Sequence, residues 1–485
     1  MTVLKAPSLP LSAERHRGAR APRWGGAVAL LTTFVVLLFA VPSNAVISGL
    51  GSLGRPSQLW GLVLLMVWVL TRLQSSSSAI AAARQPIKLL LGVLLTIALV
   101  SFAAAMLRGQ PADQVSPATT AIIRLLSWTG VVLVAADGLR TRNEISTLIR
   151  RIVIGATLLA VLGLAQFASG QSLLDWVALI PGIDLDFGGV DSRGQFTRAA
   201  GTSVHPLEFT ATMAGCLPLA VATAAAGGYL HGERWRRIWW VSPALILIVS
   251  ALAVSRSATI GLFIAAAASI PSLPRAYRWV VTVGGAAVLA VVVAVVPGLL
   301  STTLFLFTNA ADDSSTQSRT NALARLPEFV APSPFIGTGF GTFMSRYYIF
   351  DNQWVITLID LGVLGLLALI GLVVAAIWSA ASAGRQSMFI DAQMLGRAIA
   401  AAVLTVAVLF LFFDGFSFSI AAGFLFLLIG LAAAVRNVGM GDRTQHEARV
   451  RLAEVPVDDS SHPHRSRADE DGPLPQPVRA QRAEG

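Results

Sequence analysis

The sequence is poor in charged residues. Asp, Glu, Lys and Arg make up 13% of its 485 residues, about half the share found in typical soluble proteins. Hydrophobic residues make up 55%, and they recur in runs of about 17–22, each long enough to cross a hydrocarbon core of roughly 30 Å. These proportions exclude an ordinary soluble domain and predict an all-α, polytopic membrane protein.

Cysteine and histidine are also scarce. The single cysteine, Cys216, lies within an apolar run, so no disulfide can form within the chain. Of six histidines, only His205 falls in a segment predicted to face outward. One histidine without a second ligand at metal-binding spacing does not indicate a metal site. We therefore expect neither a metal ion nor another cofactor.

Positive charge exceeds negative charge, with a formal net charge of +10. The basic residues lie in short clusters between apolar runs, such as Arg234/Arg236/Arg237 and Arg275/Arg278. Such clusters orient membrane helices, whereas a nucleic-acid-binding domain gathers its charge on one face. The distribution predicts that these basic residues lie beside the lipid bilayer, and it argues against nucleic acid as a partner.

The apolar runs predict twelve transmembrane helices. Ser255-Arg256 separates the seventh from the eighth, because one helix through both would be too long for a bilayer. Residues 1–24 form a basic N-terminus resembling a signal peptide, but the many later spans favour an uncleaved first helix. The predicted spans cover about 25–42, 58–73, 86–107, 118–137, 152–169, 204–227, 238–254, 257–270, 279–298, 353–378, 397–413 and 418–435.

Lys and Arg are more frequent in alternate loops, which predicts that both termini are cytoplasmic. Two outer loops are long, at about 170–203 and 299–352, and in the second the segment Thr316–Phe329 predicts a short amphipathic helix. We expect one membrane domain over residues 25–435. Residues 436–485 carry charge and proline without a core pattern, which predicts a disordered cytoplasmic tail.

Polar residues collect at the predicted outer boundaries. Arginine on that side opposes the orientation bias, although any single one is compatible with contact to lipid phosphates. Several arginines in separate loops predict an anion site, because the planar guanidinium binds phosphate oxygens through two hydrogen bonds. The residues of interest are Arg198, Arg256, Arg319 and Arg325, with His205, Glu208, Asp351 and Asn352 beside them.

Some of these residues also have purely structural interpretations. His205 precedes Pro206 at a helix start, and Asp351 is suited to capping the helix that follows it. Asp360 lies nine residues later, on roughly the opposite helical face, which predicts a packing role. The GTGFG stretch around Gly339 lacks the Lys-Ser/Thr of a phosphate-binding loop. It predicts a glycine turn that holds the large loop against the membrane.

Four stretches carry a resemblance to a known family. In chain order they are RAAGTSVHP from Arg198, LAVSRSATIGL from Leu252, RLPEFVAPSPFIGTGFGTF from Arg325 and DNQWVITLIDLGVLGL from Asp351. By these motifs and their placement, over roughly residues 25–435, the chain resembles the O-antigen ligase and Wzy-type polymerase superfamily of bacterial envelope glycan assembly.

The resemblance implies a substrate, a reaction and a place. The substrate would be a glycan on undecaprenyl diphosphate at the outer face of the bacterial cytoplasmic membrane. An acceptor hydroxyl would displace the lipid diphosphate without a metal. Such chemistry needs cations for the leaving group and a base for the hydroxyl proton. The resemblance assigns the first role to Arg198, Arg256, Arg319 or Arg325 and the second to Asp351 or His205, with Asn352, Glu208 and Gly339 in support.

The sequence departs from the ligase pattern at one position. Ligases carry a histidine in or after the large loop, where this chain has Asp351, so we favour a polymerase over a ligase that transfers finished glycan. A transporter of lipid-linked glycan or a small solute is a further alternative. A transporter would place ionisable residues near the bilayer midplane, often in two related halves. It is disfavoured because no internal repeat is evident, and because Arg124, the clearest charged residue within a span, lies near the outer third of the bilayer. Neither the sugar, the linkage, the acceptor nor a protein partner follows from these residues.

Overall fold

The structure is a computed structural model. It describes residues 26–74, 85–185, 191–193, 196–227, 233–308, 314–344, 346–386 and 390–454. Within these ranges the chain is almost entirely helical, and nine of the described helices are long and apolar enough to cross a membrane. The all-α class is confirmed, and the protein is a multi-pass membrane protein.

Each predicted span contains one α-helix. Three of these helices, α1, α7 and α8, have only 14, 11 and 14 residues. At 1.5 Å per residue they are roughly 17–21 Å long, less than the hydrocarbon thickness of roughly 30 Å. The number of membrane crossings therefore stays a prediction. The helices are α1 (Ala27–Ala40), α2 (Pro56–Gln74), α3 (Pro86–Leu107), α4 (Ala112–Gly138), α5 (Arg142–Ser169), α6 (Pro206–Ala225), α7 (Val241–Ala251), α8 (Arg256–Ser269), α9 (Arg275–Val295), α12 (Gln353–Gln386), α13 (Ile390–Leu409) and α14 (Ser419–Glu454).

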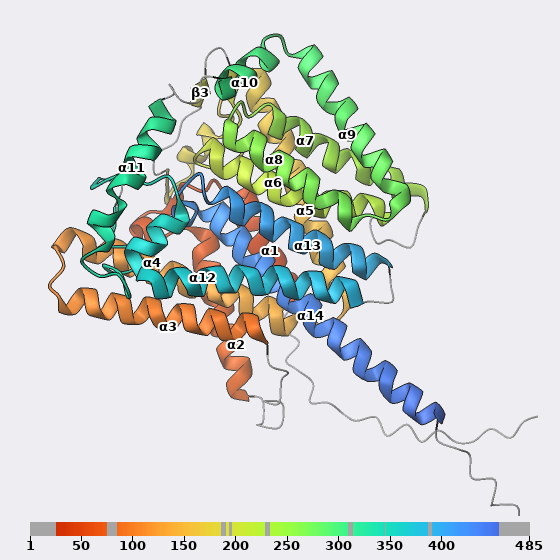
Figure 1. The fold of residues 1–485 in the computed structure, drawn as a ribbon, viewed down its shortest axis with the longest axis horizontal. Coiled ribbons are helices and arrows are strands. Elements are labelled where there is room, and N and C mark those ends of the chain that lie inside the picture. The colour runs from red at the N-terminus through yellow and green to blue at the C-terminus, as the bar shows by residue number, and fades with distance from the viewer. Residues whose placement is uncertain are drawn as a thin grey trace, which may run out of the picture. The chain divides into compact units, whose positions relative to one another are not determined.

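Helices α6 and α14 form the interior of the membrane domain. In each, 94% of the most apolar membrane-length window is buried. Helix α6 is rich in Ala and Thr and contains Gly215, and such small residues allow neighbouring helices to approach closely. A side chain on Gly215, for example, would come within 2.5 Å of Val406 on α13 and 2.9 Å of Phe424 on α14. By contrast, only 6% of the window in α9 is buried, and α9 lies at the edge of the domain beside α7 (Figure 1).

The second long loop contains two helices, α10 (Leu299–Thr308) and α11 (Ser314–Val330). Helix α11 confirms the predicted amphipathic helix and ends just before Ala331-Pro332. One face of α11 is buried against the start of α12, where Ala322 and Phe329 pack with Phe350. Helix α10 was not predicted.

The first long loop contains short strands that the sequence did not predict. Strand β1 (Ala45–Ile47), which follows α1, pairs antiparallel with β2 (Ile183–Leu185). Strands β3 (Asp191–Arg193) and β4 (Phe196–Arg198) form a hairpin. Each strand has three residues, too few for alternating hydrophobicity to indicate it.

The C-terminal segment differs from its prediction. Helix α14 continues past residue 436 to Glu454, and good helix formers such as Arg, Glu and Ala in this stretch account for its local preference. The chain divides into two compact units at Met440, and in the second unit the structure describes only the end of α14. The rest of the predicted tail and the basic N-terminus 1–24 lie outside the described residues.

Candidate functional site

The predicted site residues collect at one end of the membrane domain. Because successive helices alternate in direction, α6, α8, α12 and α14 begin at the same end at which α13 finishes; we call this the site end. Residues 410–418, the 410–418 loop, connect α13 to α14 there. Gln353 holds this loop, since its backbone N–H donates to the carbonyl of Phe410 at 2.8 Å and its side-chain oxygen accepts from the N–H of Phe416 at 2.6 Å.

Helix α11 brings Arg319 to Asp351 at this end. The Nη2 atom of Arg319 lies 3.5 Å from Oδ2 of Asp351 and donates to the carbonyl of Phe412 at 3.2 Å. The two side chains are 32% and 44% exposed, so a substrate can reach both. Asn352, rather than Asp351, caps α12, because its Oδ1 accepts from the N–H groups of Trp354 and Val355 at 3.0 and 3.3 Å. The Asp351 carboxylate is thus not occupied by the helix end.

Two further cations face the 410–418 loop. Burial raises the pKa of the Asp414 carboxyl above its usual value, while a hydrogen bond from Ser417 and the charge of Arg124 on α4 act to lower it. Arg124 also interacts with the charge of Arg55, and Nη1 of Arg55 donates to Oγ of Ser419 at 2.6 Å. We call Arg55, Arg124, Arg319, Asp351 and Asp414 the charged cluster.

Sequence reasoning did not assign three members of the charged cluster, Arg55, Arg124 and Asp414. The one available signal was the charge of Arg124 inside an apolar span, because an ionisable residue at that depth is by default a functional candidate. Arg55 and Asp414 lie in short connections whose partners cannot be read from local spacing.

His205 caps α6 and also borders the 410–418 loop. Its Nδ1 accepts a hydrogen bond from the N–H of Leu207 at 3.1 Å, and its ring centroid lies 5.9 Å from that of Phe418. A neutral imidazole that accepts at Nδ1 carries its proton on Nε2. In this state His205 is a hydrogen-bond donor at Nε2 and is not arranged as a base.

Glu208 joins three segments of the site end. It is fully buried. Its Oε2 accepts from Oγ of Ser43 at 2.8 Å and from the N–H of Val204 at 3.1 Å, and its Oε1 accepts from the N–H of Ile420 at 2.6 Å. A carboxylate at the first turn of α14 also interacts favourably with the helix dipole. These contacts make Glu208 a structural brace for the site.

Replacing Glu208 with alanine should destabilise the protein markedly. The N–H of Ile420 and the hydroxyl of Ser43 would each lose the acceptor that Glu208 provides, and each buried donor left without an acceptor costs about 1–3 kcal/mol. We expect a clearly lower midpoint of thermal unfolding for purified Glu208→Ala, whereas Glu328→Ala, which removes a 60% exposed side chain, should leave the midpoint unchanged. A Glu208→Ala protein that is as stable as wild type but inactive would instead assign this carboxylate to the chemistry.

Arg198 ends β4 and is 8% exposed. The chain after it turns through Gly201, whose φ of +58° favours glycine and whose added side chain would meet Leu159 at 2.7 Å. Oε1 of Gln166 on α5 accepts from the N–H groups of Ala200 and Gly201 at 3.1 and 2.7 Å. The Gly-Thr-Ser stretch therefore fixes the entry to α6 in one position.

Arg256 is the first residue of α8. The helix therefore begins at the break that the sequence predicted between the seventh and eighth spans. Val254 turns the chain there with a φ of +42°. Helix α8 packs closely on the end of α13, since a side chain on Gly261 would come within 2.7 Å of Leu409. Arg256 lies five residues earlier, about 7–8 Å along the axis, and so at the level of the 410–418 loop.

Part of the site end lies in a segment that is similar to a known protein family. Residues 241–370 match the family model described as O-antigen ligase. This segment is similar to the O-antigen ligase family. The predicted resemblance to that superfamily is confirmed, and the matched segment includes Arg256, Arg319 and Asp351, whereas Arg198 and His205 precede it. No curated protein matches the chain.

Within the matched segment, Arg325 has a different environment from Arg319. Its guanidinium donates to Oε2 of Glu328 at 3.0 and 3.1 Å and lies 4.9 Å from the ring centroid of Tyr348. Six residues separate the two arginines, which places them on different faces of α11. Arg319 faces the charged cluster, and Arg325 lies on the exposed side.

The glycine turn around Gly339 is held by Asp360. Oδ2 of Asp360 accepts from the N–H of Gly341 at 2.8 Å, and Oδ1 accepts from the N–H of Phe343 at 3.2 Å. Gly339 has a φ of +133°, and a side chain there would meet Ala105 of α3 at 2.5 Å. The buried Asp360 was predicted to be a packing residue, and its specific task is to fix this turn.

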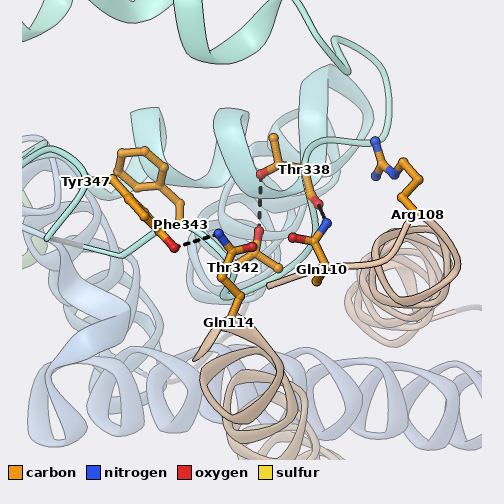
Figure 2. A pocket seen from close by; sticks show the side chains of 7 residues that line it. All are labelled: Arg108, Gln110, Gln114, Thr338, Thr342, Phe343 and Tyr347. Carbon is orange, nitrogen blue, oxygen red and sulfur yellow. Dashed lines mark hydrogen bonds between the residues drawn. The ribbon is translucent and has the colours of Figure 1, made fainter. Parts of the chain in front are cut away.

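A polar cavity lies beside the turn (Figure 2). Its volume is about 240 Å³, and it is enclosed by the end of α3, the start of α4 and the segment after Gly337. Thr338, Thr342 and Phe343 belong to the glycine-rich stretch noted in the sequence, but no residue of the cavity was assigned a role in the site. The lining residues are Arg108, Gln110, Gln114, Thr338, Thr342, Phe343 and Tyr347.

Proposed function

We propose that this protein is a metal-independent glycosyltransferase that uses a glycan on undecaprenyl diphosphate at the outer face of the bacterial cytoplasmic membrane. The match to the O-antigen ligase family supports glycosyl transfer as the reaction class. The observation that carries the proposal is the accessible Asp351 carboxylate beside Arg319, inside the matched segment. The site end would then face outward, in agreement with the distribution of Lys and Arg between the loops.

The proposed reaction forms one glycosidic bond and breaks one glycosyl phosphate bond. The oxygen of an acceptor hydroxyl attacks the anomeric carbon of the lipid-linked sugar, and the bond from that carbon to the diphosphate breaks. The hydroxyl proton passes to Asp351 as general base. Charge develops on the departing diphosphate, where fixed cations lower the barrier. We assign this role to Arg319 and Arg256, with Arg198 and Arg124 completing the positive surface.

His205 is better suited to positioning than to proton abstraction. Because its Nδ1 is already an acceptor, the proton of the neutral ring is on Nε2, and neither nitrogen is arranged to take up a further proton. Asn352 and Glu208 hold the first turns of α12 and α14, and Gly339 shapes the turn beside them. We therefore assign the base to Asp351 alone.

A Wzy-type polymerase is the form of the proposal that we favour. Asp351 stands where ligases of this superfamily carry histidine. Transfer of finished glycan to another acceptor by a ligase needs the same leaving group and the same kind of base. The length of glycan on the lipid carrier distinguishes the two, since only a polymerase lengthens it.

Arg319 and Arg325 provide a matched comparison within one helix. Arg319→Ala should lower the rate of glycan transfer about 100-fold, the usual effect of losing one fixed charge-stabilising group. Arg325→Ala should leave the rate close to that of wild type, because its guanidinium contacts Glu328 and Tyr348. Transfer rates of the purified variants test this expectation. Equal losses would show that both arginines meet the diphosphate.

Profiling of lipid-linked glycans in a deletion strain tests the function itself. Single repeat units that accumulate on undecaprenyl diphosphate, and that disappear when the wild-type gene is restored, would establish a polymerase. Long chains that remain on the carrier would establish a ligase. Repeat units trapped on the cytoplasmic leaflet would indicate transport and overturn the proposal.

A further inference from the structure

The polar cavity offers uncharged hydrogen-bonding groups around an aromatic wall (Figure 2). Gln110 and Gln114 supply amides, Thr338 and Thr342 supply hydroxyls, and Phe343 and Tyr347 supply rings. The lining contains no carboxylate. Its one cation, Arg108, already donates to the carbonyls of Ala104 and Gly337, each at 3.1 Å. The cavity is therefore suited to a neutral polar molecule rather than to an ion.

Sugars match this combination of groups. Amide and hydroxyl side chains can both donate and accept, as neighbouring hydroxyls on a sugar ring require. The flat faces of Tyr347 and Phe343 suit the apolar C–H face of the same ring. At about 240 Å³, the cavity is smaller than the roughly 300–1,000 Å³ of sites for drug-sized ligands. It suits one sugar ring better than an oligosaccharide.

The groups that would bind the sugar are held in place before it arrives. Nε2 of Gln114 donates to the hydroxyl of Tyr347 at 2.7 Å, and the hydroxyls of Thr338 and Thr342 are 3.3 Å apart. Arg346 covers the Tyr347 ring at 5.1 Å from its centroid and pairs with Asp113 on α4. A prearranged site loses less conformational freedom on binding, which favours affinity.

The position of the cavity relates it to the proposed reaction. Its glycine turn is anchored by Asp360 on α12, the helix that Asp351 precedes. Gln114 and Arg124 lie on the same helix, ten residues or about 15 Å apart along the axis. A sugar in the cavity would therefore lie too far from the charged cluster to be the sugar that reacts. The cavity suits a sugar further along the same glycan.

The cavity lies on the side of α12 that faces away from Arg256. Helix α12 packs between α3 and α13, whereas α8, which begins with Arg256, packs on α13 and α6 (Figure 1). The α12–α13 pair therefore separates the cavity from Arg256. In the proposed reaction the diphosphate of the donor occupies the Arg256 side, which leaves the cavity side for the acceptor.

We propose that this cavity binds one neutral sugar ring of the acceptor glycan, at a distance from the reacting hydroxyl. The proposal rests on the proposed function, because that function defines the acceptor. It makes Gln114, Thr342 and Tyr347 determinants of which glycan is extended. They are not catalytic residues.

A binding experiment tests the cavity without the lipid-linked donor. The probe is the neutral oligosaccharide released by hydrolysis from the envelope polysaccharide of the producing strain, titrated into the full-length protein in lipid nanodiscs. Tyr347→Ala and Gln114→Ala should each weaken binding at least tenfold. The hydrogen bond between the two side chains is exposed and Tyr347 is 43% exposed, so neither change should unfold the protein. Thr119→Val is the control, since Thr119 is an exposed residue of α4 that donates only to Val115.

Two results would overturn the proposal. One is the absence of saturable binding to wild-type protein, and the other is equal binding by wild type and both cavity variants. With purified enzyme and lipid-linked donor, the cavity variants should raise KM for the acceptor at unchanged kcat. Failure of the proposed function would appear instead in the glycan profile of the deletion strain, which does not depend on sugar binding in this cavity.

Discussion

Asp351→Asn should abolish most glycan assembly, with the rate falling by about 10²- to 10⁴-fold, the usual contribution of a general base. Asparagine keeps the size and polarity of the side chain, and its amide cannot take up the proton of the attacking hydroxyl at neutral pH. Single repeat units on the lipid carrier should accumulate in cells that carry this variant. Turnover by the purified protein, with a defined acceptor and lipid-linked donor, measures the size of the loss.

Two companion variants make this result specific. Asp184→Asn removes an exposed carboxylate from β2 in the other long loop and should leave the rate unchanged. Asp351→Glu keeps the carboxylate but moves it by one methylene, so partial activity is expected. If Asp351→Asn were to produce glycan of normal length at normal protein abundance, the pair with Arg319 would be structural and the base would have to be sought elsewhere.

Much of the fold was predictable because its signals are local. Hydrophobic runs, basic clusters and helix-breaking residues located the membrane helices, and the break at Ser255-Arg256 followed from the length of the combined run and the basic clusters on either side of it. The amphipathic spacing in the large loop predicted α11. The same local logic brought Arg319 and Asp351 to one end of the domain, and the structure places them 3.5 Å apart.

The parts that were missed depend on contacts between distant segments. Arg55 and Ser419 are 364 positions apart, and Glu208 and Ile420 are 212 apart. No periodicity in the sequence reports such pairs, so the charged cluster could be only partly predicted. Asp360 was assigned to packing because it lies on the face of α12 opposite Asp351. The glycine turn docks on that opposite face, which cannot be known before the loop is placed.

Gly362→Ala should prevent the protein from accumulating in the membrane. Gly362 interrupts α12 with a φ of +67° and a ψ of −170°, a region of backbone conformation that is essentially restricted to glycine. An alanine side chain would also lie 2.3 Å from the backbone of Phe335, which cannot move without displacing the turn. Because strain and a backbone clash act together, we expect the free energy of unfolding to fall by more than about 4 kcal/mol, which few single substitutions cause.

The interruption has a purpose that the contacts explain. It lets the N–H of Val363 donate to the carbonyl of Pro334 at 2.8 Å and that of Leu364 donate to Phe335 at 3.2 Å. Helix α12 thereby binds the segment that leads into the glycine turn, while Asp360 binds the turn itself. The kink, the turn and the cavity beside it are thus one assembly, mounted on the helix that follows Asp351.

Gly371→Ala provides the control in the same helix. A side chain there would make only ordinary contacts, at 3.4 Å or more from Leu90, and alanine favours a helix interior over glycine by up to about 1 kcal/mol. Membrane abundance and the midpoint of thermal unfolding should be unchanged or slightly raised. A Gly362→Ala protein with wild-type stability would show that α12 can straighten. In that case the glycine turn, and with it the proposed acceptor site, would not be rigidly tied to the helix of the base.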